Sequence, residues 1–167
     1  MESNETIPDL KLKIELVPQT ARIYSIRREV SPETWNFIRQ MCYQKYSNRC
    51  GICGIEGKPL ECHEMWDYHE DTCMQKFGGL IALCPDCHDV KHIGMAHIKA
   101  GNGLLDFDEL IRHFCKVNQC TEKEYKQHFK DATEEYERRS KIKWNFDNDG
   151  FVENLKKSQT YHSGKGK

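Results

Sequence analysis

Two Cys-x-x-Cys pairs in the middle of the chain carry the clearest chemistry. Their members are Cys50, Cys53, Cys84 and Cys87. Each short turn presents two sulfur atoms to one ion, and two such turns complete the tetrahedral coordination that Zn²⁺ prefers. Gly51 and Gly54 permit the tight backbone that these turns require. The spacing therefore predicts a closed, structural zinc site.

Three histidines predict a second metal site. His88 and His92 are four residues apart, so on a helix they lie on one face, one turn from each other. His63 follows a predicted strand at 59–61, which the zinc would bring close to that helix. Three protein ligands leave coordination positions open for water and substrate, which is typical of a catalytic ion. Imidazole is softer than Mg²⁺ prefers, so Mn²⁺, Ni²⁺ and Zn²⁺ are candidates beside Mg²⁺.

The order of these residues resembles that of the HNH nucleases with a ββα-metal core, in the branch with a four-cysteine zinc site. The resemblance covers about residues 45–95, and its last part reads Leu-Cys-x-x-Cys-His-x-x-x-His. It implies a treble-clef zinc core and a metal-dependent endonuclease that hydrolyses phosphodiester bonds in DNA. Carried over, His63 is the strand ligand and Glu64 the general base, while His88 and His92 are the helix ligands. The implied catalytic residues are His63, Glu64 and His88.

Two departures from the family pattern leave alternatives open. Many relatives carry His-His or Asp-His where this chain has Cys62-His63-Glu64, and a shifted register makes His63 the base and puts Cys62 in the ligand place. The Asn of the family's name, which commonly braces the loop carrying the base, would stand at Gly79. The alternative function is therefore a catalytically inactive HNH-fold zinc module that binds nucleic acid or a protein partner.

The general base is the least determined part of this site. Phosphodiester hydrolysis by one ion requires a cation on the scissile phosphate and a base that takes a proton from water. A nearby cation favours the ionised form of Glu64 and weakens it as a base. His69 is an alternative base or a phosphate contact. In a third interpretation, the histidines recruit Glu64 or Cys62 and form a second structural zinc site.

The net charge of −1 argues against a general nucleic-acid coat. A nuclease can nevertheless keep a local basic face, because affinity for phosphates follows the Lys and Arg side chains that touch them. Arg27 and Arg28 follow Tyr24, and Arg49 precedes the first cysteine pair. Trp66 either stacks on a base or covers the zinc module. The expected partner is double-stranded DNA, and the oligomeric state is left open.

Hydrophobic patterning predicts an α+β protein with helices flanking the zinc core. The alternation from Leu10 to Val17 predicts a half-buried strand. Ser31 and Pro32 open a predicted helix, and 106–118 carries one apolar stripe. Thr121-Glu122-Lys123-Glu124 is a capping box that begins another helix. The last two helices are expected to form a hairpin on the core, followed by a strand within 141–146.

The length of 167 residues suits one compact unit with extensions. Five segments are expected: a flexible N-terminus at 1–9, a strand and helix at 10–47, the zinc and ββα-metal core at 48–95, the hairpin and short strand at 104–146, and a disordered tail at 158–167. No stretch approaches 18 apolar residues, and the acidic start does not resemble a signal peptide. The nine cysteines agree with a reducing compartment. We therefore expect a cytoplasmic protein without membrane contact.

Overall fold

A computed structural model describes residues 9–163, with side chains described for 9–157. After a 3-10 turn at Gln19–Ala21, the elements are α1 Ile26–Glu29, α2 Pro32–Lys45, β1 Glu61–His69, β2 Met74–Leu83, α3 Pro85–Lys91, α4 Ile93–Gly101, α5 Phe107–Asn118, α6 Glu122–Arg139, β3 Asn145–Asp147 and α7 Phe151–Ser163. This arrangement confirms the predicted α+β class. No helix of the described part is long and apolar enough to cross a bilayer.

A β-hairpin is the centre of the molecule. β1 and β2 pair antiparallel, with His63 opposite Ile81, and β3 joins the other edge of β2 in parallel. The register shifts between Met65 and Trp66, opposite Gly79, whose φ is +118°. A side chain at that φ would be strained, so this irregularity in the ladder favours glycine. The position expected for the family Asn is therefore one where the backbone itself selects Gly.

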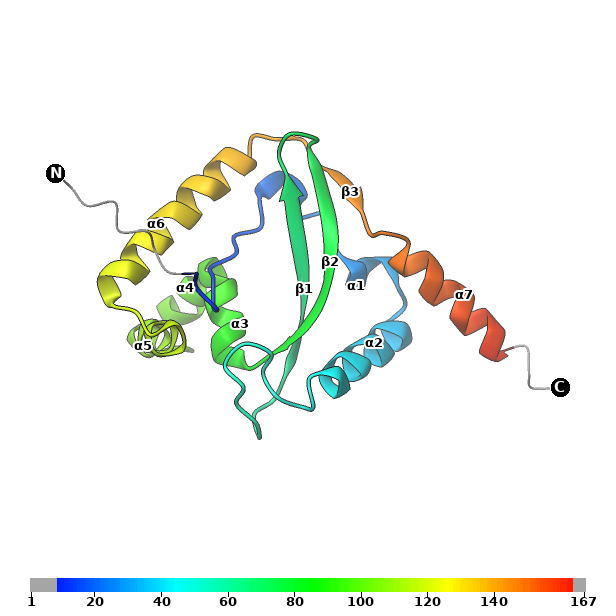
Figure 1. Cartoon of the computed structure of the whole chain (residues 1–167), viewed down its shortest axis with the longest axis horizontal. Coiled ribbons are helices and arrows are strands. Elements are labelled where there is room, and N and C mark those ends of the chain that lie inside the picture. Colours follow the sequence, from blue (N-terminus) through cyan, green and yellow to red (C-terminus); the bar gives the residue numbers. More distant parts are fainter. Residues whose placement is uncertain (1–8, 164–167) are drawn as a thin grey trace.

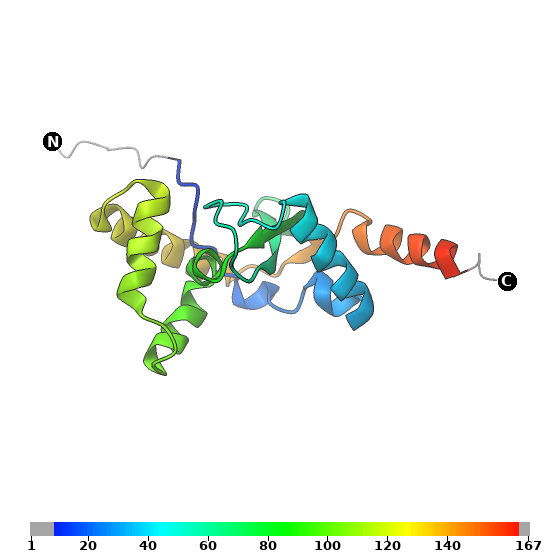
Figure 2. The ribbon, with the colours of Figure 1, turned by 90° about the horizontal axis from the view of Figure 1, so that it is seen from below.

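Helices lie on both sides of this hairpin. Figure 1 shows α2 on one side and α3 to α6 on the other, with α3 contacting both strands and α5. Figure 2 shows α7 extending away from the sheet at one end of the molecule. The hydrophobic core includes Leu12, Val90, Ile93 and Phe114, all at most 1% exposed. The core thus joins the N-terminal segment to α3, α4 and α5, next to the cysteines.

The predicted strand from Leu10 to Val17 is wrong. Leu10, Leu12 and Ile14 are buried and Lys11 is exposed, as the alternation requires, but this segment is not assigned to a strand. Its neighbours are helices, which cannot supply the ladder of backbone groups that a strand needs. The alternation therefore predicted which side chains are buried, but it did not predict how the backbone is hydrogen-bonded.

Side chains and one carbonyl group bind the backbone of this segment instead. The Asn118 side-chain oxygen accepts from Leu12 N, and its amide nitrogen donates to Leu12 O, each over 2.9 Å. Ile14 N donates to His128 Nε2 over 2.9 Å, and Glu15 N donates to Lys91 O over 3.0 Å. The segment is thereby fixed against α3, α5 and α6.

Most predicted helix starts are confirmed. The Ser31 side chain accepts from Thr34 N at the start of α2, and the capping box of Thr121 and Glu124 begins α6. Asp106 caps α5 by accepting from the backbone of the next turn. These short-range signals were sufficient because each satisfies backbone N–H groups that a helix leaves unpaired.

Three element boundaries differ from expectation. The spacing of His88 and His92 predicted one helix for both, but α3 ends at Lys91 and α4 begins at Ile93, with His92 at the junction. The strand expected within 141–146 is Asn145–Asp147. The predicted disordered tail is wrong for 158–163, which belong to α7. The buried Val152 anchors the start of this helix. Once a helix is nucleated, each further turn costs little free energy. Residues 1–8 and 164–167 lie outside the described residues.

Candidate metal centres

The structure brings the four predicted cysteines together. One sulfur atom from each of Cys50, Cys53, Cys84 and Cys87 lies within 4.8 Å of the others, and all four thiols are free. Cys53 Sγ and Cys84 Sγ are 3.7 Å apart. Two sulfur atoms at about 2.3 Å from one tetrahedral Zn²⁺ would be about 3.8 Å apart. This group could therefore hold a metal ion such as zinc.

Local backbone geometry explains the first cysteine pair. Cys50 N donates to Ile55 O over 3.0 Å, and Gly54 N donates to Cys50 O over 2.9 Å. Gly54 has φ +75°, a left-handed conformation that suits glycine. A Cβ at Gly51 would lie 2.7 Å from the Tyr46 ring, so a larger residue does not fit there. The two glycines thus allow the chain to turn both sulfur atoms toward α3.

His113 contacts one of these sulfur atoms. His113 Nε2 lies 3.1 Å from Cys87 Sγ, a contact between α5 and α3. An imidazole N–H in this position can donate to a thiolate and hold it in place. No local spacing signals this contact, because 26 residues separate the two side chains.

The second predicted group also comes together. One ring nitrogen from each of His63, His88 and His92 lies within 4.8 Å of the others. Burial and the neighbouring His63 lower the pKa of both His88 and His92 to about 4. These two imidazoles are therefore neutral near pH 7, and a metal ion would not have to displace protons from them.

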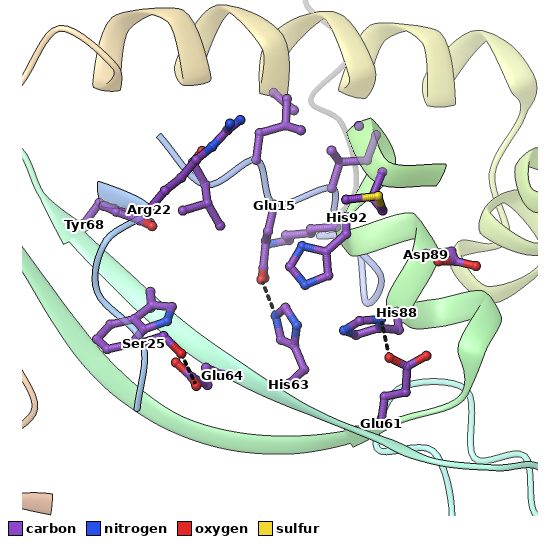
Figure 3. A pocket seen from close by; sticks show the side chains of 18 of the residues that line it. Glu15, Arg22, Ser25, Glu61, His63, Glu64, Tyr68, His88, Asp89 and His92 are labelled. Carbon is purple, nitrogen blue, oxygen red and sulfur yellow. Dashed lines mark hydrogen bonds and ion pairs between the residues drawn. The ribbon is translucent and has the colours of Figure 1, made fainter. Parts of the chain in front are cut away.

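Two carboxylates that no motif of the sequence marks contact these histidines. His88 Nδ1 lies 3.0 Å from Glu61 Oε2, and His63 Nε2 lies 3.1 Å from Glu15 Oε2 (Figure 3). A metal-binding histidine commonly donates its second ring N–H to a carboxylate, which orients the ring. With Nδ1 of His88 directed at Glu61, Nε2 is the ring nitrogen that could bind a metal ion. Strand periodicity could have identified Glu61, because it precedes His63 by two residues and shares its face.

Glu64 does not face the histidines. Alternation along β1 points it to the opposite side from His63, where its carboxylate accepts from the Ser25 hydroxyl and from the backbone N–H groups of Ile26 and Arg27, each over 3.0 Å. These contacts fix the start of α1. The base role expected for Glu64 is therefore incompatible with this placement.

Cys62 and His69 also lie away from the histidine cluster. Cys62 shares the face of Glu64, and its hydrogen bond with Cys42 on α2 raises its thiol pKa. It is therefore directed away from the ligand place suggested by a shifted register. His69 ends β1, six residues beyond His63. At about 3.3 Å per residue, the two lie about 20 Å apart, too far for His69 to act on a water molecule at the histidines.

A large cavity adjoins the three histidines. It has a volume of about 2210 Å³, and its walls come from the N-terminal segment, α1, α2, β1, α3, α4 and α6. Small-molecule pockets usually measure about 300–1,000 Å³, so this one suits part of a larger ligand. The walls carry both acids and bases, and the bases include Arg27 and Arg28. Both side chains line this cavity, and the Arg28 guanidinium donates to the carbonyl groups of Arg22 and Ile23.

Arg49 and Trp66 are placed differently from expectation. Arg49 is absent from the cavity lining and pairs with Glu56 across the first cysteine turn, over 2.9 Å. Trp66 lies at the cavity wall, but its ring packs against Phe77 and Phe146, with centroids 5.3 Å away in each case. Packing therefore accounts for the position of Trp66, and Arg49 lies outside this cavity.

Comparisons with protein-family models, with curated proteins and with solved structures found no match to this chain. What the site can do is therefore argued from its own geometry and from the sequence pattern.

Proposed function

We propose that this protein is a metal-dependent endonuclease of the HNH type, which hydrolyses phosphodiester bonds in DNA. The observation that carries this proposal is the convergence of three imidazoles beside a four-cysteine cluster. His63 comes from β1 of the hairpin, His88 from α3, and His92 from the junction between α3 and α4. The adjoining cavity is large enough for a nucleic-acid segment and carries exposed arginines.

The four cysteines hold Zn²⁺ in this proposal, and the zinc has a structural role. Cysteine ligation at all four positions leaves no place for water or substrate. Small zinc modules gain about 10 kcal/mol or more from metal binding, most of which is folding free energy. Zinc would thus join the first cysteine turn to α3, which carries His88.

The histidines hold the catalytic cation. Such an ion supplies charge neutralisation at the scissile phosphate and at the leaving 3′ oxygen. His88 and His92 are the helix ligands, and Glu61 keeps the His88 ring in the required orientation. An imidazole-rich set favours Mn²⁺, Ni²⁺ or Zn²⁺ over Mg²⁺, which prefers oxygen ligands.

His63 remains as the general base. Of the three candidates from the sequence, Glu64 faces α1 and His69 lies at the far end of β1. His63 is 5% exposed and belongs to the histidine cluster, where the attacking water would lie. We therefore assign His63 the role of proton acceptor in the cleavage step. His88 and His92 are then the metal ligands.

A second candidate function is an inactive HNH-fold module that binds nucleic acid or a protein. Gly79 occupies the position of the family Asn, and its positive φ disfavours a return to Asn. This observation favours loss of catalysis without affecting the zinc site. The cavity and its arginines would then serve binding alone.

Cleavage of supercoiled plasmid and of single-stranded RNA tests the proposal. The wild type, His88→Ala and His69→Ala are compared in Mg²⁺, Mn²⁺ or EDTA, with the zinc content of each protein measured. We expect metal-dependent nicking of plasmid by the wild type and by His69→Ala, and a loss of about 100-fold or more in His88→Ala. Both variants should retain about one zinc per chain.

The matched histidine control separates the two functions. Equal nicking by His88→Ala and the wild type would exclude this centre as the site of catalysis. If no protein cleaves either nucleic acid in any metal, the inactive binding module becomes the better account.

A further inference from the structure

Glu15 is the acidic side chain in direct contact with His63. Its Oε2 lies 3.1 Å from His63 Nε2, and the two residues are 48 positions apart in the chain. Figure 3 shows the Glu15 carboxylate pointing at the His63 ring from the side opposite β1. Glu15 belongs to the N-terminal segment, outside the 48–95 core in which the sequence placed the site.

Lys91 holds the other oxygen of Glu15. Lys91 is 6% exposed, and its ammonium group contacts Glu15 Oε1. A carboxylate paired with a buried ammonium group is favoured in its ionised form. Glu15 is therefore suited to accept hydrogen bonds, and it does not itself take the proton of a water molecule.

An ionised carboxylate can only accept hydrogen bonds, and this determines the tautomer of His63. The neutral imidazole must carry its proton on Nε2, which faces Glu15. Its lone pair is then on Nδ1. The contact thus fixes both the orientation of the ring and the nitrogen that remains free to take a proton.

We propose that Glu15 is a positioning residue that holds His63 with Nδ1 ready to act as the general base. This inference rests on the proposed function. In the reaction, an O–H bond of water breaks and its proton goes to Nδ1. The water oxygen forms a bond to phosphorus, the bond from phosphorus to the 3′ oxygen breaks, and the leaving oxygen takes a proton from solvent. The Glu15 charge stabilises the imidazolium formed on His63.

Contacts from outside the β1–β2 hairpin hold Glu15 next to His63. Asn118 binds Leu12, His128 binds Ile14, and the Lys91 carbonyl binds Glu15 N. These contacts fix the backbone of the segment at Leu12, Ile14 and Glu15. The α5–α6 hairpin therefore helps to position Glu15, although neither helix contributes a residue to the histidine cluster.

The test compares Glu15→Gln with Glu134→Gln. Glutamine keeps the size of residue 15 but removes its charge, and Glu134 lies on the wall of the same cavity without being one of the groups that contact the histidines. Nicking kinetics give kcat and KM, metal analysis gives zinc content, and ¹⁵N NMR of the imidazole gives the His63 tautomer. In Glu15→Gln, we expect kcat about 10- to 100-fold lower, with KM and zinc content unchanged.

The NMR measurement should show the Nε2–H tautomer of His63 in the wild type and in Glu134→Gln, and a tautomer mixture in Glu15→Gln. An active wild type whose kcat and tautomer are unchanged by Glu15→Gln would overturn the inference and leave the proposed function standing. A fall in zinc content or a change in KM alone would show that Glu15 has only a structural role, and would also overturn it. Absence of nicking by the wild type would refute the proposed function, and the tautomer measurement would still decide whether Glu15 positions His63.

Discussion

His113 illustrates how one side chain can tune the cysteine cluster without being a ligand. Its Nε2 is 3.1 Å from Cys87 Sγ. Donation from an imidazole N–H would stabilise a zinc-bound thiolate, and contacts of this kind typically change metal affinity by about 10- to 100-fold. His97 offers a matched control, because its ring stacks on Phe107, 4.1 Å away, and contacts no cysteine of the cluster in the described part.

We predict that His113→Ala folds with zinc bound but releases it about 10-fold faster to a competing chelator than the wild type does. The reason is the loss of a donor that would stabilise the zinc-bound thiolate of Cys87. The measurement is the rate of colour development with a chromogenic zinc chelator. Equal release rates in His113→Ala, His97→Ala and the wild type would show that the contact does not affect the metal.

At the same scale, the two candidate metal-binding clusters were predictable from the sequence, and the side chains that contact them were not. The spacing of Cys84, Cys87, His88 and His92 is local, so helix and turn geometry were sufficient to bring them together. Glu15 and His113 reach the two clusters only through tertiary packing, which no local pattern encodes. The base role predicted for Glu64 was wrong because it rested on the family pattern alone. Adjacent residues on a strand face opposite sides, so Glu64 and His63 cannot both face the cluster.

The N-terminal segment acts as an element even though it forms no strand. Its backbone pairs with the Asn118 amide at Leu12 and with His128 at Ile14. Sequence alternation correctly predicted the buried side chains and wrongly predicted a ladder. The helix caps at Ser31 and Thr121 were predictable because each cap depends on residues within one turn.

We predict that Asn118→Ala lowers the free energy of unfolding by about 1–3 kcal/mol, because Leu12 loses both backbone partners. Nicking should also slow, since Glu15 follows Leu12 by three residues and depends on the same segment. Urea denaturation and the nicking rate measure the two effects. Asn102→Ala, at the exposed C-cap of α4, should change neither. An unchanged stability in Asn118→Ala would show that the segment is held by its apolar side chains alone.

On the scale of the whole molecule, a near-neutral net charge is compatible with the proposed DNA substrate because basic side chains line the cavity. The chain has 25 basic and 26 acidic residues, so binding to phosphates depends on which arginines face the substrate. Arg27 is exposed at the cavity wall, whereas Arg49 lies outside it and pairs with Glu56. The two arginines therefore provide a matched pair for measuring phosphate contacts.

We predict that Arg27→Ala weakens DNA binding and reduces the slope of log K against log salt concentration by about 1, as expected for one lost phosphate contact. Arg49→Ala should leave the slope unchanged. Fluorescence anisotropy with a labelled duplex, in a metal that does not support cleavage, gives both slopes. A larger effect from Arg49→Ala than from Arg27→Ala would place the nucleic-acid face on the cysteine turn instead of the cavity.

In the proposed function, His88 and His92 hold a catalytic metal ion beside His63, in a centre that is distinct from the four-cysteine cluster. The most direct measurement is a Mn²⁺ titration of the zinc-loaded wild type and His88→Ala, followed by electron paramagnetic resonance and by plasmid nicking on the same samples. We predict that the wild type binds one Mn²⁺ per chain and that its nicking rate rises with occupancy. Both signals should be lost in His88→Ala while zinc remains bound. Nicking that persists in His88→Ala, or Mn²⁺ bound by the wild type without any nicking, would contradict the claim.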